Sequence, residues 1–417
     1  MRIVLLLLLL ASQAWAQPDF RELEKVATAE LQETNTPGAV VVVVKDDRVI
    51  YTGAFGVASV ETREAVRPEM LFRLGSTTKM FVATALALLA DGGKVQFDQP
   101  IRRYIADLPT AVGRLTLHQL LSHTSGLRDT AVMFGPHDDA ALGAGILAWN
   151  ESWFFTEPGA IYSYSNPGYW LSGYALERIT GKPFADAMHE TVFQRLGMQR
   201  TTFRPTLAMT YPLALGHDAP GKETPKVVRP FADNASNWPA GSMFSSGPEL
   251  ARFVLAFLNR QGLPAAVVET LSTPRVDTNA EGEYGYGLGM RRSRGVNWIS
   301  HNGSRSGYGS MIQMAPAHRF GVIVLVNKSG GTLPKTLEKA DELLLTLEAK
   351  PAPEPPAPPS ASPRYAGVYV NGDSRTELVI RDGKLAPKEG ARGPLRIVEK
   401  GGQIYMVRGG RAARKIP

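Results

Sequence analysis

The chain has 417 residues, of which 44% are hydrophobic and 20% are charged, and its formal net charge is +7. This length suits one large domain with a smaller one, and the composition is that of a globular protein with a sizeable core. The sequence contains no cysteine, which excludes disulfides, thiolate metal sites and a lipidated N-terminal cysteine.

The positive charge is concentrated at the C-terminal end. Residues 364–417 hold 12 Lys/Arg against 5 Asp/Glu, so the rest of the chain is neutral overall. A neutral main domain lacks the basic surface that a nucleic-acid partner needs, and we expect no such partner. The basic segment predicts either contact with an anionic surface through 364–417 or simply charge for solubility.

The N-terminal residues have the features of a secretory signal. Arg2 precedes an apolar run over 3–11, and Ala14-Trp15-Ala16 forms a small-x-small cleavage site. The run is shorter than the roughly 20 residues that span a bilayer. We therefore expect a signal peptide over 1–16, a periplasmic or secreted protein, and no transmembrane segment after cleavage.

The first half of the remaining chain predicts a helix, a hairpin and then helices. Residues 20–33 have helical periodicity, and 40–51 contain two β-branched runs around a polar turn. Residues 77–90 are apolar nearly all round, which predicts a helix buried at the centre of the domain. Helices and loops are expected over about 100–260.

Strand patterns return late in the chain, at 296–300, 309–314 and 321–327, before a helix at about 334–348. Strands at both ends of one segment, with helices between them, predict a single antiparallel sheet. The expected fold class is therefore α+β, with an antiparallel sheet from both chain ends flanked by helices, plus a helical subdomain.

A proline-rich stretch separates a second unit. Residues 351–363 read as an extended linker after a main domain over 17–350. Beyond it, 364–417 contains short strand patterns at 365–370, 377–380 and 403–407 with hairpin-turn signals between them. This segment predicts a small basic β module.

The first chemical signal is Ser76-x-x-Lys79, at the start of the apolar helix. Residues three apart share one helix face, and a helix N-terminus favours a developing negative charge. Alone, the pattern also fits a helix start with a surface lysine. However, a lysine in the first turn of a buried helix needs a reason.

Two further groups follow along the chain. Tyr164-Ser165-Asn166 places a phenol and a carboxamide two residues apart, and Tyr162 offers a second phenol. His301-Asn302-Gly303 is expected at the end of the strand around Trp298, just before Ser304. Taken singly, these groups are an aromatic turn and a structural histidine.

In this order and at these spacings, the three groups resemble the serine β-lactamase, D-alanyl-D-alanine peptidase and family VIII esterase superfamily. Residues 120–127, 239–246 and 284–289 resemble further segments of that family, and the resemblance covers about 20–348. The Lys-Thr-Gly of many β-lactamases is absent, and His301 stands in the lysine position. Ser-Asp-Asn is also absent, which argues against class A.

The resemblance implies a β-lactamase/transpeptidase-like fold and the role of each site residue. It assigns catalysis to Ser76, Lys79 and Tyr164, and substrate binding to Asn166, His301, Gly303 and Ser304. Ser76 would be acylated, with its backbone N–H and that of Ser304 as the oxyanion hole. Either Lys79 or Tyr164 would take the serine proton, and His301 would lie beside Tyr164, shaping the proton path or binding a substrate carboxylate. No metal or organic cofactor is implied.

The expected function is a serine acyl hydrolase. Its substrate would be a small molecule or a peptidoglycan-derived D-amino-acid peptide, as for a D,D-carboxypeptidase, or a simple ester. β-Lactamase activity is an alternative, and a non-catalytic scaffold that binds cell-wall fragments is one of another class. The sequence has no Gly-x-Ser-x-Gly, and the zincin-like start His189-Glu190 is not completed, because position 193 is Phe. We expect the 364–417 module to be dispensable for chemistry, unless it folds back over the cleft.

Overall fold

The computed structural model describes residues 18–130, 132–220, 223–280, 282–350, 362–389 and 394–416. The predicted signal peptide and residues 351–361 of the predicted linker lie outside the described residues. Within the described ranges, none of the helices combines the length and the apolar character that crossing a membrane requires.

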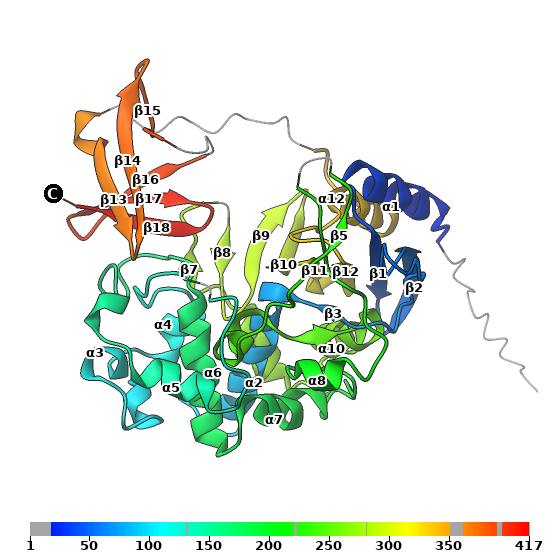
Figure 1. The fold of residues 1–417 in the computed structure, drawn as a ribbon, viewed down its shortest axis with the longest axis horizontal. Helices are drawn as coiled ribbons and strands as arrows, with labels where there is room; N and C mark the ends of the chain where they lie inside the picture. The colour runs from blue at the N-terminus through cyan, green and yellow to red at the C-terminus, as the bar shows by residue number, and fades with distance from the viewer. Residues whose placement is uncertain are drawn as a thin grey trace, which may run out of the picture.

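The main domain is built on one eight-stranded antiparallel sheet (Figure 1). Its strand order is β2-β1-β12-β11-β10-β9-β8-β7, so the N-terminal hairpin pairs with the last strand of the domain. The expected sheet from both chain ends is confirmed. Its strands are β1 (Gly38–Lys45), β2 (Arg48–Gly56), β7 (Val276–Asp277), β8 (Glu283–Tyr284), β9 (Gly289–Ser293), β10 (Val296–Arg305), β11 (Tyr308–Ala315) and β12 (Phe320–Val326).

The central strands are buried on both faces because their valine-rich runs have no polar side. Val40 and Val42 of β1 pack into the large core on one face, and Val41 and Val43 pack into a second core on the other. The second core is closed by α1 (Arg21–Glu33) and α12 (Pro334–Leu344). The helix predicted at about 334–348 is α12, which ends at Leu344, four residues before the predicted end.

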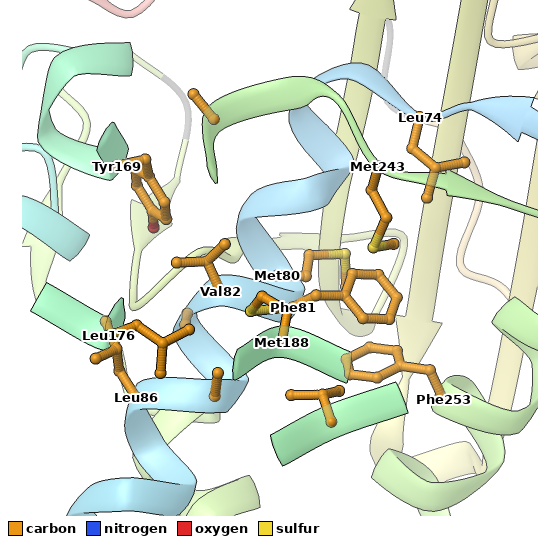
Figure 2. Packing of buried hydrophobic residues seen from close by; sticks show 14 of the residues in the cluster. Leu74, Met80, Phe81, Val82, Leu86, Tyr169, Leu176, Met188, Met243 and Phe253 are labelled. Atoms are coloured by element: carbon orange, nitrogen blue, oxygen red, sulfur yellow. The ribbon is translucent and has the colours of Figure 1, made fainter. Parts of the chain in front are cut away.

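The helical part surrounds α2 (Thr78–Asp91), the buried helix that the sequence predicted. Figure 2 shows its side chains in the core, with Phe81 and Phe253 pointing toward each other, their ring centroids 4.3 Å apart. A helix this apolar is stable only when neighbours cover it all round. The other helices are α3 (Thr110–Gly113), α4 (Leu117–Leu121), α5 (Ala141–Leu147), α6 (Asn166–Thr180), α7 (Phe184–Met188), α8 (Pro205–Ala208), α9 (Trp238–Gly241), α10 (Gly247–Asn259) and α11 (Ala265–Ser272).

Two small antiparallel pairs complete the main domain. β3 (Phe72–Arg73) pairs with β6 (Phe244–Ser245), and β4 (His217–Asp218) pairs with β5 (Lys226–Val227). The β3–β6 pair matters for the site, because the chain leaves β3 directly into the turn that begins α2.

The C-terminal module is a six-stranded antiparallel sheet in the order β15-β14-β13-β18-β17-β16. It has its own small core, with Tyr369, Leu378 and Met406 buried in it. A small β module was predicted, but half of its strands were missed. The strands are β13 (Gly367–Asn371), β14 (Ser374–Arg381), β15 (Lys384–Pro387), β16 (Arg396–Lys400), β17 (Gln403–Arg408) and β18 (Arg411–Lys415).

The module packs directly on the helical part of the main domain. Phe155 and Ile161 of the main domain form one apolar cluster with Tyr405, Val407 and Ala412 of β17 and β18. In Figure 1 the module, orange to red, lies over this part of the chain. The contact brings the β17–β18 hairpin to the loop that precedes α6.

Candidate active site

Ser76 lies in a single 3₁₀ turn, η1 (Gly75–Thr77), that leads into α2. Gly75 has φ +56°, and a Cβ on it would lie 2.6 Å from the backbone nitrogen of Ser304. A Cβ on Gly303 would meet the carbonyl oxygen of Leu74. Both positions therefore require glycine, and their close approach sets the backbone of β10 beside the Ser76 turn. The backbone nitrogen of Ser304 therefore lies next to the turn that carries Ser76.

Lys79 is completely buried in the first turn of α2. Its Nζ lies 3.2 Å from Ser76 Oγ, 2.9 Å from Asn166 Oδ1 and 2.7 Å from the carbonyl oxygen of Ala240. Burial lowers the pKa of Lys79 to about 7, because desolvation disfavours the ammonium form. A substantial fraction of this lysine is therefore neutral near pH 7 and able to accept a proton.

Tyr164 is the second group in contact with Ser76. Burial raises the pKa of Tyr164, while its hydrogen bond with Ser76 acts in the opposite direction. Lys79 Nζ lies 4.8 Å from the centroid of the Tyr164 ring. At neutral pH the phenol therefore keeps its proton, whereas Lys79 is partly neutral.

His301 lies inside β10, not at its end as the sequence suggested, because the strand continues to Arg305. Its Nδ1 is 2.6 Å from the carbonyl oxygen of Asn302, and its Nε2 is 3.0 Å from the hydroxyl of Tyr284. A carbonyl only accepts, so Nδ1 carries the proton and Nε2 accepts from Tyr284. Burial and the nearby charge of Lys79 lower the pKa of His301 to about 3. A neutral imidazole gives a substrate carboxylate no charge to bind.

The structure brings all the predicted site residues together around one cavity of about 620 Å³. Ser76, Tyr164, Asn166, His301 and Ser304 line it, while Lys79 and Gly303 lie directly behind them. No group of described residues has the composition of a metal site.

The cavity wall is cationic. Arg305 and Arg411 line it, and its described lining residues include no Asp or Glu. Arg305 is 8% exposed, and its Nε and Nη2, which are shielded from solvent, have no hydrogen-bond partner. The nearby carboxylate of Asp233 is already bound by Arg73 at 3.0 Å. A positive charge at the wall of a cavity, shielded from most of the solvent, favours an anionic ligand.

Comparison with known families agrees with this geometry. The family model described as beta-lactamase matches residues 23–346. The chain belongs to the beta-lactamase family. Its fold is thus the β-lactamase/transpeptidase-like fold that the sequence predicted, and members of this family are typically serine hydrolases.

Individual relatives of the beta-lactamase family are distant. Protein flp of Staphylococcus aureus strain N315 is 24% identical over 328 residues, which cover 76% of this chain and 65% of flp. SurE has a TM-score of 0.75 at 23% identity, covering 95% of this chain and 98% of its own, and it is also solved with D-Leu. D-alanine carboxypeptidase AmpC from Burkholderia cenocepacia has a TM-score of 0.63 at 22% identity, covering 78% of this chain and 99% of its own.

Two residues that contact the site, Asp129 and Arg411, were not predicted from the sequence. Asp129 Oδ1 accepts from the backbone N–H and from Nδ2 of Asn166, at 2.8 and 3.0 Å. Arg411 Nε donates to Asp129 Oδ2 at 2.6 Å, and the carbonyl oxygen of Gly410 accepts from the N–H of Tyr164 at 2.9 Å. Asp129 follows the segment at 120–127 that matched the beta-lactamase family. No sequence pattern pointed to Arg411 except the Gly409-Gly410 pair before it.

Proposed function

We propose that this protein is a serine acyl hydrolase that forms an acyl-enzyme at Ser76. The observation that carries this proposal is the buried Lys79, with its pKa lowered to about 7 and its Nζ 3.2 Å from Ser76 Oγ. A nucleophile and a matched base within hydrogen-bond reach are the requirement for nucleophilic catalysis near neutral pH.

In acylation, neutral Lys79 takes the proton of Ser76 as Oγ attacks the substrate carbonyl. The negative charge that develops on the carbonyl oxygen is met by the backbone N–H groups of Ser76 and Ser304. The bond between the carbonyl carbon and the leaving group then breaks, and Tyr164, which keeps its proton at neutral pH, donates it to the leaving group. The Lys79 ammonium returns a proton to Tyr164. Water then attacks the acyl-enzyme, and the same groups act in reverse.

The substrate class that fits best is a peptide ending in a D-amino acid with a free carboxylate. Arg305 supplies positive charge to a cavity whose described lining has no acidic side chain, whereas Arg411, also in the lining, is paired with Asp129. Structures similar in fold include a D-alanine carboxypeptidase and SurE solved with D-Leu, which supports this choice. A neutral ester would leave the positive charge that Arg305 contributes to the cavity wall without an opposite charge, so esters come second.

A matched pair of substrates tests this choice. Hydrolysis of an acylated D-alanyl-D-alanine peptide is compared with hydrolysis of its C-terminal amide, which lacks the charge. We expect the acid to be preferred, and Arg305→Gln to remove at least about tenfold of that preference. Equal rates for acid and amide, with p-nitrophenyl acetate turned over faster than both, favour the esterase instead. Ser76→Ala is the control for background hydrolysis.

Two other functions remain to be compared. β-Lactamase activity requires fast deacylation, and the absence of Lys-Thr-Gly argues against it; nitrocefin turnover measures it. A non-catalytic cell-wall-binding scaffold of the same fold predicts binding of wall fragments without labelling of Ser76. A binding scaffold does not need a buried lysine with a lowered pKa, so Lys79 argues against this function.

The setting of the protein is part of the same proposal. A periplasmic or secreted location suits a cell-wall substrate, and cell fractionation tests it. Contact of 364–417 with an anionic surface predicts salt-sensitive binding to anionic vesicles or walls.

A further inference from the structure

A continuous series of hydrogen bonds joins the C-terminal module to the catalytic lysine. Arg411 of β18 donates to one oxygen of Asp129, and the other oxygen of Asp129 accepts from Asn166 Nδ2. Asn166 Oδ1 in turn accepts from Lys79 Nζ at 2.9 Å. Asp129 and Asn166 are therefore each hydrogen-bonded on both sides, so the series is unbroken from Arg411 to Lys79.

We propose that Arg411 is a positioning residue that holds Lys79 against Ser76 through Asp129 and Asn166, so that the docked module completes the catalytic site. This inference rests on the proposed function, because it concerns how Lys79 acts. It replaces the expectation from sequence that 364–417 is dispensable for chemistry.

The orientation of one amide explains why Asp129 matters. An ionised carboxylate only accepts hydrogen bonds, so it must face the Nδ2 side of Asn166. The Oδ1 side is then left for Lys79, which always has an N–H to donate. Without the carboxylate, Asn166 is free to turn its NH₂ group toward the lysine, which would lose its acceptor and its position.

Arg411 fixes Asp129 in turn. The Nε–Oδ2 distance of 2.6 Å is that of a charge-assisted bond, and the Asp129 side chain is only 12% exposed. A second side chain of the module, Asn371, accepts from the N–H of Asp129 at 3.4 Å and donates to the carbonyl oxygen of Ala412 at 2.7 Å. Asp129 is thus held by the module at both its side chain and its backbone.

The same hairpin also fixes the second catalytic group. The carbonyl oxygen of Gly410 accepts from the N–H of Tyr164, and the N–H of Ala412 donates to Ser163 Oγ at 3.0 Å. The guanidinium carbon of Arg411 lies 5.1 Å from the centroid of the Tyr164 ring. Undocking of β17–β18 would therefore release Tyr164 as well as Asp129.

The charges around Lys79 make the inference testable by pH. Asp129 raises the pKa of Lys79, whereas Arg411 and Arg305 lower it, all against the larger effect of burial. Removing the charge of Arg411 leaves Asp129 uncompensated, so the pKa of Lys79 rises. Removing the charge of Asp129 lowers it. The titratable groups that face Lys79 from the packed elements are Asp129, Arg411, Arg305, Tyr164, Tyr169, His123 and His301.

The experiment follows acylation of the full chain by p-nitrophenyl acetate from pH 5 to pH 9. We expect Arg411→Gln to slow acylation at least about tenfold and to move the acid limb up by about half to one pH unit, the effect of one charge in a partly solvated site. Asp129→Asn should move the limb in the opposite direction. Arg411→Lys should keep the limb at the wild-type pH, because it keeps the charge, while still lowering the rate.

Arg375→Gln is the matched control, because it removes one exposed positive charge from β14 of the same module; it should behave as wild type. The inference is overturned if Arg411→Gln and Arg375→Gln give the same profile, or if Arg411→Gln and Asp129→Asn shift the limb in the same direction. If Arg411→Gln does not fold in a thermal melt, a wild-type rate for Arg411→Lys overturns the inference equally. Wild-type protein that is not acylated refutes the proposed function instead, so the two failures are distinct.

Discussion

The pH dependence of acylation follows directly from the environment of Lys79. Its pKa falls from the usual 10.5 to about 7, which corresponds to about 5 kcal/mol of destabilisation of the ammonium. As a base, Lys79 must be neutral, so acylation rises as the pH rises through this pKa. We expect an acid limb centred near pH 7, with the rate at pH 5 about one hundredth of the plateau.

The alkaline side of the profile separates Lys79 from Tyr164. Burial raises the pKa of Tyr164, so its phenol stays protonated and the plateau should extend to about pH 10. Single-turnover acylation by p-nitrophenyl acetate in buffers of constant ionic strength measures both limbs. A rate that is independent of pH from 5 to 8, or one that begins to rise only above pH 9, would refute the assignment of Lys79 as the base.

Four further outcomes follow from the same geometry. Lys79→Met should abolish acylation yet raise the melting temperature by a few degrees at pH 6, because it removes a buried ammonium. The difference in melting temperature should shrink as the pH rises from about 7 toward 10.5, and a lower melting temperature of the variant at pH 6 would contradict this. Tyr164→Phe should lower the acylation rate by about 10², and a near wild-type rate would make Tyr164 structural. Gly75→Ala should destabilise the protein by more than the roughly 1–3 kcal/mol of backbone strain, because the added Cβ would meet the backbone of Ser304. Gly93→Ala is the control, because Gly93 has φ +73° with open space around it, so only the backbone strain is added. Equal losses of stability in chemical denaturation would contradict the close approach. Truncation after Lys350 should leave a folded domain that acylates at least about tenfold more slowly, and unchanged turnover would restore the view that the module is separable.

The fold was largely predictable because its signals are local. The valine run in β1 and the apolar run in β12 have no polar face, so both had to be buried strands. The apolar helix over 77–90 appears one residue later, as α2. The missed strands β15, β16 and β18 are short and rich in Lys and Arg. Such strands exist because neighbouring strands pair with them, which no window of sequence shows.

The candidate site was predictable where a motif carries the chemistry. Ser76, Lys79, Tyr164 and His301 stand at family spacings, and the structure places them around one cavity. Asp129 and Arg411 were missed because their roles depend on a contact between residues 282 apart in the chain. His301 was placed at a strand end because the glycine and serines after it resemble a turn. The strand continues to Arg305, and the glycine at 303 lets its backbone pack directly against the carbonyl oxygen of Leu74.

Active-site labelling followed by peptide mass spectrometry tests directly whether Ser76 is the residue that is acylated. The full chain is treated with a fluorophosphonate probe or a fluorescent penicillin at pH 8, where most of Lys79 is neutral, and the modified peptide is sequenced. We expect one adduct on Ser76, absent in Ser76→Ala and strongly reduced in Lys79→Ala. An adduct on another residue, or labelling that persists in Ser76→Ala, would contradict it.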